Sequence, residues 1–388
     1  MNSLKEKTMV GKVTVGKGRP RLEAAKRIVI KIGSALLVEA ARGTVHREWL
    51  NYLAADIAHC RSRNQDVIVV SSGAIAIGRR VLNLSDGALK LEEKQAAAAV
   101  GMVHLAHAYQ EILGHHDLSV AQVLLTIGDT EDRRRYINAR NTLEQLLSLG
   151  VVPLINENDT VATDEIRFGD NDRLAGRVAA MVGADVLLLL SDIDGLYSAD
   201  PRVDKTAGHV HEVAEITPKI EAMAGSIVRG DGSGGMVTKI AAAKVAVQAG
   251  CHMVIFDGAV ERPLTQLEEG ARCTWFLSSA TPQTARKLWI GGALRTTGTL
   301  IVDDGALKAL EQGRSLLPAG VIGVEEKFER GDAVIVKSSD GREVARGLVA
   351  YSVEDARAIM GHKSGEIEEL LGYRGRDEMI HRDDLVLT

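Results

Sequence analysis

Residues 27–34 read RIVIKIGS, and this segment indicates the architecture of much of the 388-residue chain. An apolar run rich in isoleucine and valine carries a single lysine, Lys31, and ends at the glycine-serine pair Gly33 and Ser34. Similar apolar runs recur along the chain, and longer segments with helical periodicity lie between them. This alternation predicts an α/β fold with a mainly parallel sheet and crossover helices.

The predicted strands of this sheet are short and almost free of charge, which is typical of strands buried on both faces. After the first strand they lie at residues 66–71, 118–126, 151–156, 185–191, 251–256 and 273–277. The predicted helices lie at residues 46–64, 92–113, 133–149, 173–182 and 237–249.

The pattern changes near residue 297, where short β runs separated by turn residues begin to dominate. Runs at 299–302, 319–324, 333–337, 344–350 and 385–387, with short helices near 306–312 and 352–359, predict a small, mainly-β second domain. We therefore expect four parts: a basic, mobile tail (1–26), a catalytic domain (27–280), a linker (281–296) and the second domain (297–388).

Composition restricts the class of protein. The net charge is −5 and only 3% of residues are aromatic, which argues against nucleic acid or an anionic membrane as the main partner. No apolar run approaches the length of a membrane span. Cys60, Cys251 and Cys273 match no metal-ligand spacing and are expected to be buried thiols in a reducing compartment. We expect a cytoplasmic protein, although the basic N-terminal segment leaves a transit peptide open.

Polar residues follow most of the predicted strands of the first domain, and ligands bind at the carboxyl ends of strands in open parallel sheets. Each cluster also has an ordinary structural explanation, as an edge lysine, a helix cap or a solvated loop. Two acids and an amide before the helix at 173 exceed what capping needs. The candidates after successive strands are Lys31, Ser72, Asn156, Asp159, Ser191 and Asp192, and the candidates Asn171 and Asp172 precede the helix at 173.

A glycine-rich segment, GDGSGGMVTK at residues 230–239, precedes the last helix of the first domain. It contains GxGxxG, but no strand immediately precedes it, and it lacks the P-loop pattern. It predicts an amide-rich loop at a helix N-terminus, with Lys239 one turn inside, which suits nucleotide phosphates. Two lysines, a glycine loop and several carboxylates at strand ends together indicate phosphoryl transfer.

The order of these motifs resembles the amino acid kinase family, over nearly the whole chain from Arg27 onward. The matching motifs are VIKIGS (29–34), SSGA (71–74), NEND (156–159), GDND (169–172), SD (191–192) and GGMVTK (234–239). QVLLT (122–126) and NAR (138–140) also match, within the branch of the family that phosphorylates glutamate. The segment from about residue 297 resembles the PUA module that many bacterial members of this branch carry.

The resemblance implies a three-layer sandwich that phosphorylates the γ-carboxylate of L-glutamate with ATP and Mg²⁺, the first step of proline biosynthesis. It implies that Lys31 and Lys239 neutralise the transferring phosphoryl group and that Asp172 orients them. Feedback inhibition by L-proline and assembly into homo-oligomers, often tetramers, are also implied. The expected ligand contacts are Ser72, Asp159, Asn171 and Asn156 for glutamate, and Lys31, Ser191, Asp192, Ser233, Gly234, Gly235, Met236, Val237, Thr238 and Lys239 for ATP.

Two alternatives remain open at this point. A kinase of the same fold could act on N-acetylglutamate, aspartate or a phosphate such as uridylate. An RNA-binding protein could act through the PUA-like domain. Residues 297–388 hold 12 Lys/Arg and 18 Asp/Glu, a balance of −6, and this acidic surface speaks against RNA.

Overall fold

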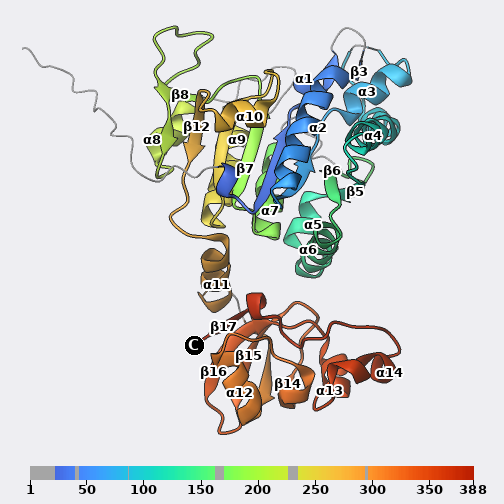
Figure 1. Ribbon diagram of the computed structural model, residues 1–388, viewed down its shortest axis with the longest axis vertical. Helices are drawn as coiled ribbons and strands as arrows, with labels where there is room; N and C mark the ends of the chain where they lie inside the picture. Colours follow the sequence, from blue (N-terminus) through green and yellow to red (C-terminus); the bar gives the residue numbers. More distant parts are fainter. Residues whose placement is uncertain (1–21, 40–42, 86, 162–169, 226–234, 293–295) are drawn as a thin grey trace, which may run out of the picture.

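The computed structural model describes residues 22–39, 43–85, 87–161, 170–225, 235–292 and 296–388 (Figure 1). It contains a larger N-terminal unit built on one mixed sheet and a smaller C-terminal unit built on a second sheet. Within the described residues, no helix is both long and apolar enough to cross a membrane.

The central sheet has eight strands in the order β10-β12-β11-β7-β1-β4-β6-β5. All neighbouring pairs are parallel except β11 and β12, which are antiparallel, so the prediction of a mainly parallel sheet is confirmed. The strands are β1 (Arg27–Ile32), β4 (Asp66–Val70), β5 (Val120–Leu125), β6 (Val152–Glu157), β7 (Val186–Ser191), β10 (Glu212–Val213), β11 (His252–Asp257) and β12 (Cys273–Phe276).

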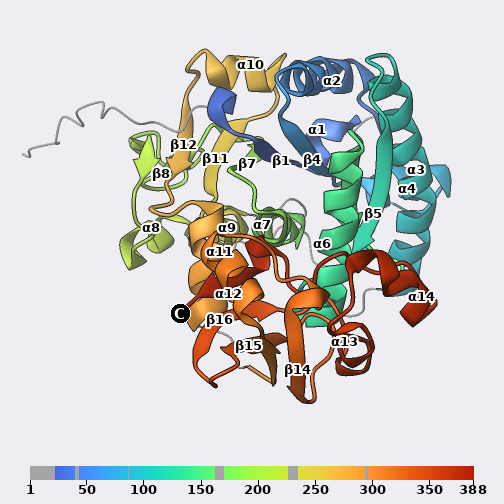
Figure 2. The same cartoon turned by 60° about the horizontal axis from the view of Figure 1, so that its bottom comes forward.

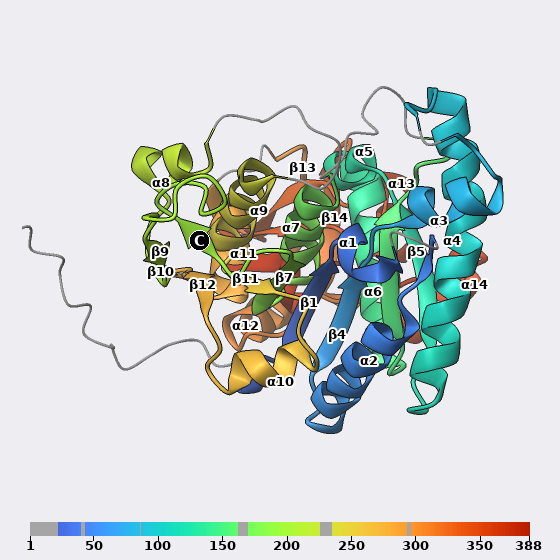
Figure 3. The same cartoon turned by 90° about the horizontal axis from the view of Figure 1, so that it is seen from above.

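Helices cover both faces of this sheet, which makes the three-layer sandwich (Figure 3). Alternate residues of β1 point to opposite layers, because side chains along a strand alternate between its two faces. Ile28, Ile30 and Ile32 pack in the core with α2 (Arg47–Ser62), α4 (Leu91–Gly114) and α10 (Pro263–Glu268). Val29 packs in the opposite core with α6 (Arg133–Ser148), α7 (Asp170–Val182) and α9 (Met236–Gln248).

Several short elements complete the first unit. They are α1 (Ser34–Leu37), β2 (Val38–Glu39), β3 (Thr44–Val45), α3 (Ala74–Val81), α5 (Ile127–Glu131), β8 (Leu196–Tyr197), β9 (His209–Val210) and α8 (Pro218–Met223).

The C-terminal unit is a five-stranded sheet in the order β14-β13-β15-β16-β17, as the sequence predicts for a small, mainly-β domain. Its own core centres on Leu300, Val334, Val336 and Tyr351. The elements are β13 (Gly298–Val302), α12 (Asp304–Glu311), β14 (Val321–Glu326), β15 (Ala333–Ser338), β16 (Glu343–Leu348), α13 (Val353–Ile359), α14 (Ile367–Leu371) and β17 (Leu385–Leu387), with 3-10 turns at Pro318–Gly320, Ser364–Glu366 and Arg382–Asp384.

The segments that the sequence assigns to the linker and to the tail both contain regular structure. Residues 282–292, inside the expected linker, form helix α11 (Pro282–Gly292), which packs against β16 and β17 (Figure 2). Residues 22–24, inside the expected tail, form a 3-10 turn whose Leu22 is buried in the core. Residues 1–21 lie outside the described residues, so the mobile tail stays a prediction there.

Candidate active site

Three charged side chains meet where β1, α7 and α9 come together. The Lys31 Nζ lies 2.6 Å from Oδ1 of Asp172, and the Lys239 Nζ lies 3.4 Å from Oδ2 of the same carboxylate. All three side chains are buried, and that of Asp172 is fully enclosed. The sequence prediction that these residues form one site is therefore consistent with their placement, although they are separated by up to 208 positions in the chain.

The electrostatics of this trio depend on the balance between burial and neighbouring charge. Burial raises the pKa of Asp172, but the two lysine ammonium groups lower it more, so the pKa lies below its ordinary value. The Thr238 hydroxyl adds a hydrogen bond to Oδ2 at 2.9 Å, which further stabilises the carboxylate. Two ammonium groups around one carboxylate leave a net positive charge, which attracts phosphoryl oxygens.

A second group of polar side chains lies at the ends of the neighbouring strands β4 and β6. The Asn171 Nδ2 donates to the Ser72 hydroxyl at 2.8 Å, the Ser71 carbonyl at 3.1 Å and Oδ1 of Asn156 at 3.3 Å. Asn171 directly precedes Asp172, so this network lies beside the lysine trio. Among the described residues, no group bonds to the buried Oδ1 of Asn171, and that oxygen can accept a hydrogen bond from a ligand.

Asp159 follows β6 and is nearly as buried as Asn156, with exposed fractions of 8% and 4%. A buried carboxylate two residues beyond β6 belongs to the same end of the sheet as the Asn171 network. The structure thus places Asn156, Asp159, Asn171 and Ser72 at the carboxyl edge of the sheet, as strand-end reasoning predicts.

The remaining candidates lie on the other side of β1. Ser191 ends β7, the neighbour of β1, and its hydroxyl donates to Oδ1 of Asp192 at 3.1 Å. Ser191 is buried, whereas Asp192 is exposed. Ser191 and Asp192 therefore lie at the end of the strand beside Lys31.

The N-terminus of α9 carries the described part of the glycine loop. Gly235 is the exposed N-cap, and Met236 and Val237 form the half-buried first turn. The first amides of a helix have no partner within the helix and favour anions such as phosphate. Ser233 and Gly234 lie outside the described residues, so their assignment to this loop's ligand contacts stays a prediction.

Two contacts in this site were not predicted from the sequence. The Thr238 side chain bonds to Asp172, whereas the sequence assigned Thr238 only to ATP. The Ser71 carbonyl, which the sequence did not single out, holds the Asn171 amide. Both contacts join elements far apart in the chain, and no local pattern specifies such a pairing.

Comparisons with known proteins identify the family of this chain. The amino acid kinase family model matches residues 26–257, and the PUA domain model matches residues 298–371. A protein of Paramagnetospirillum magneticum named glutamate 5-kinase is 63% identical over 366 residues, which are 94% of this chain and 99% of that one. A glutamate 5-kinase of Rhizobium rhizogenes is 59% identical, over 95% of each chain.

A solved structure of a UMP kinase from Bacillus anthracis aligns with 66% of this chain and 98% of that chain, at 14% identity and a TM-score of 0.45. The two family models and the relatives each span most of one or both structural units. The chain therefore belongs to the amino acid kinase family and is an enzyme of that family with a PUA domain after its kinase fold.

Proposed function

We propose that this enzyme transfers the γ-phosphoryl group of ATP to the γ-carboxylate of L-glutamate, the first step of proline biosynthesis. An oxygen of that carboxylate attacks the γ-phosphorus, the bond to the bridging oxygen breaks, and ADP leaves with the electron pair. The observation that carries the proposal is the buried Lys31–Asp172–Lys239 trio beside the Asn171 amide network. The relatives named glutamate 5-kinase support the choice of acceptor.

In this proposal the two lysines stabilise charge on the transferring phosphoryl group. Phosphoryl transfer needs positioning and positive charge more than covalent chemistry, and fixed ammonium groups supply both. Asp172 touches both lysines and holds them on opposite oxygens of one carboxylate, so its role is to position them.

Glutamate needs partners for a free α-ammonium and for its carboxylates. Asp159 supplies a buried carboxylate for the ammonium, and Oδ1 of Asn171, which has no partner among the described residues, can accept from the same group. Ser72 and Asn156 join this group of polar side chains through Asn171. N-acetylglutamate has no such ammonium and would leave Asp159 without a charged ligand.

ATP is placed along Ser191, Asp192 and the segment 233–239, with its phosphates at the N-terminus of α9. Mg²⁺ enters as part of the Mg·ATP substrate. Among the described residues no group of three or more His, Cys, Asp or Glu could hold a metal ion by itself. Mg²⁺ usually binds phosphates together with one or two carboxylates rather than a full protein cage.

The remaining expectations belong to the same proposal. They are inhibition by L-proline, a homo-oligomer such as a tetramer, a cytoplasmic location, and a division into a catalytic domain at 27–280, a connection at 281–296 and a PUA-like domain at 297–388. The acidic balance of the last domain supports a role in regulation or assembly rather than in RNA binding.

The test is trapping of the acyl phosphate. The full chain is incubated with Mg·ATP and hydroxylamine, and hydroxamate is measured with L-glutamate, N-acetyl-L-glutamate or L-aspartate, each with and without L-proline. We expect hydroxamate with L-glutamate and its suppression by L-proline. Hydroxamate formed only with another acceptor would overturn the assignment of L-glutamate as the substrate. Turnover of L-glutamate that L-proline does not suppress would overturn only the proposed inhibition by L-proline.

A further inference from the structure

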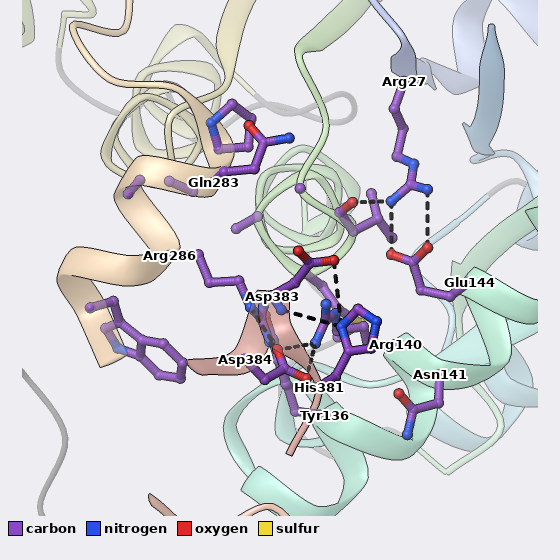
Figure 4. Close-up of a pocket in the computed structure, with 18 of the residues that line it drawn as sticks. Arg27, Tyr136, Arg140, Asn141, Glu144, Gln283, Arg286, His381, Asp383 and Asp384 are labelled. Carbon is purple, nitrogen blue, oxygen red and sulfur yellow. Dashed lines mark hydrogen bonds and ion pairs between the residues drawn. The ribbon is translucent and has the colours of Figure 1, made fainter. Parts of the chain in front are cut away.

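A cavity of about 990 Å³ lies between the kinase fold and the PUA domain, away from the catalytic lysines (Figure 4). Its walls come from the first residues of β1 and β4, from α6 and α11, and from residues 376–384 of the PUA domain. The amino ends of parallel strands lie at the edge of a sheet opposite their carboxyl ends. The cavity is therefore distinct from the proposed site for ATP and glutamate, and its volume is typical of small-molecule sites.

Most of the carboxylates that line this cavity already have cationic partners. Arg27 pairs with Asp66 at 3.1 Å and with Glu144 at 2.8 Å. Asp384 accepts from Arg140 at 2.8 Å and from Nε of Arg286 at 2.9 Å, and Figure 4 shows these side chains converging. Three further lining acids have these contacts: Glu131 with Arg177, Asp185 with the backbone N–H groups of residues 26 and 27, and Asp383 with His381. Glu378, the remaining lining acid, has no cation within 4.0 Å among the described residues.

Two lining arginines stand apart, because in the described part of the chain neither has a carboxylate within 4.0 Å. Arg133 donates to the Gly331 carbonyl and lies 5.8 Å from the centre of the Trp289 ring. Arg376 donates to Oδ1 of Asn141 at 2.5 Å. Both groups are thus held by neutral hydrogen-bond partners and have no ion-pair partner among the described residues.

The charges around these two arginines do not cancel. Burial lowers the pKa of Arg133; Asp332 raises it and Arg286 lowers it further. Burial likewise lowers the pKa of Arg376, and among the facing charges Asp384 and Glu378 raise it while Arg140 and Arg330 lower it. Around the pair, the guanidinium groups outnumber these carboxylates, and an anion would relieve the repulsion.

We propose that the cavity is a binding site for a compact multivalent anion, of the pyrophosphate or tricarboxylate type, held chiefly by Arg133 and Arg376. Guanidinium groups bind carboxylate and phosphate oxygens through paired N–H donors, which favours such anions over neutral ligands. This inference goes beyond the proposed phosphoryl transfer and does not depend on it.

The cavity also lies where a ligand would touch both catalytic helices. α7 and α9 carry Asp172 and Lys239 near their N-termini, and the other ends of the two helices line the cavity at residues 180–183 and 245–249. The helices pack closely, since a Cβ on Gly176 would lie 3.0 Å from the Ala242 carbonyl oxygen. An anion bound here is thus in contact with the elements that position the catalytic residues.

The test uses calorimetric titration of the full chain with its catalytic site filled by a non-hydrolysable ATP analogue. Pyrophosphate is titrated in one arm and citrate in the other. The anion that binds with the higher affinity identifies the class of ligand. We expect saturable binding of one anion per chain. Arg133→Gln and Arg376→Gln should each weaken it by about 10-fold or more, because a hydrogen-bonded charge is lost.

Arg357→Gln is the matched control, because Arg357 is exposed on α13 and does not line the cavity. It should change the affinity by less than about 2-fold. In the unmodified chain, the bound anion should also protect Arg133 and Arg376, but not Arg357, from modification by phenylglyoxal. This measurement does not require the variants to fold. Absence of saturable binding in both arms, unchanged affinity in both cavity variants, or equal loss in Arg357→Gln would overturn the proposal.

Discussion

Lys31 is a costly residue for a buried strand, because removing an ammonium group from water disfavours its charged form. The fold compensates with the fully enclosed Asp172, which Lys239 also contacts. Removing one partner from a buried ion group leaves uncompensated charge, at a cost of about 3–5 kcal/mol. The trio is therefore better understood as a device that keeps two lysines charged and in place than as a source of stability.

Asp159 provides the residue-scale test of substrate recognition. Asp159→Asn keeps the size and polarity of the side chain but removes the charge that we assign to the α-ammonium. A lost charge-assisted hydrogen bond of about 1.5–3 kcal/mol should raise the KM for glutamate by about 10- to 100-fold, with a smaller change in kcat. Steady-state kinetics on glutamate would measure this.

The control for that variant is Asp117→Asn, at an exposed turn with φ of 56°, a conformation that asparagine also tolerates. Its KM should stay at the unmodified value. An unchanged KM in Asp159→Asn would remove Asp159 from the ammonium site.

At the scale of elements, α3 and α4 show why small residues matter in this chain. A Cβ built on Gly78 would lie 1.7 Å from the Ala97 carbonyl oxygen, and one built on Gly101 would lie 1.8 Å from that of Ala74. The two helices therefore cross with their backbones in contact. Since α3 directly follows Ser72 and Gly73, this crossing supports the loop that holds the Asn171 amide.

Gly101→Ala should push the two helices apart. Inserting a methyl group into a packed interface typically costs about 1–3 kcal/mol, and here the obstacle is backbone rather than a flexible side chain. Gly114→Ala, at the end of the same helix, meets no atom within 4 Å and should be neutral or stabilising by up to about 1 kcal/mol. Urea unfolding of both variants measures the difference, and equal free energies of unfolding would contradict the close crossing.

The same scale shows how far sequence patterns predict this fold. The apolar runs predicted every strand of the kinase sheet except β10, which has only two residues, because buried parallel strands are nearly free of charge. Helix α3 was not predicted, since its eight residues include Gly78 and its packing partner α4 is set by tertiary structure. Helix α11 was not predicted either, because its buried contact, Ile290, lies against Ala333 and Leu348 of the distant PUA domain.

At the scale of the whole molecule, Asp384 links the two structural units. It belongs to the C-terminal unit, and its carboxylate accepts from Arg140 of α6 and Arg286 of α11. Burial raises the pKa of Asp384, but the two guanidinium charges lower it more, so the pKa lies below its ordinary value. The carboxylate therefore stays ionised at neutral pH and joins the units through charge.

Asp384→Asn should leave the two arginines without a counter-charge and destabilise the chain by about 3 kcal/mol. Because the pKa of Asp384 is lowered in the folded state, its ionised carboxylate stabilises the fold. This stabilisation is fully present above the unfolded-state pKa of about 3.9 and is lost as the pH falls through the folded-state pKa. The gap in the free energy of unfolding between the unmodified chain and the variant should thus stay constant from about pH 8 to 5 and narrow below about pH 4.

Denaturant unfolding at several pH values measures this gap. Asp377→Asn, at an exposed position of the same domain, should change stability by less than about 0.5 kcal/mol. A gap that widens on acidification would contradict the assigned sign.

The candidate site was predictable from the sequence only in part. Strand-end reasoning brought Lys31, Asn156 and Asp159 to one edge, because the carboxyl ends of parallel strands share that edge, and the excess of acids before the helix at 173 indicated Asp172. It could not predict that Thr238 bonds to Asp172, or that Arg140 and Arg286 converge on Asp384, since these pairs depend on how distant elements pack.

The central claim is that Lys31 and Lys239 stabilise the phosphoryl group during its transfer to glutamate. The most direct measurement is kcat for glutamate-dependent hydroxamate formation by Lys31→Ala and Lys239→Ala, with the exposed Lys308→Ala of α12 as the control. We predict that each active-site variant, shown to be folded by circular dichroism, loses about 10²- to 10³-fold in kcat, whereas the control keeps normal turnover. Near-normal turnover in either folded active-site variant would contradict the claim.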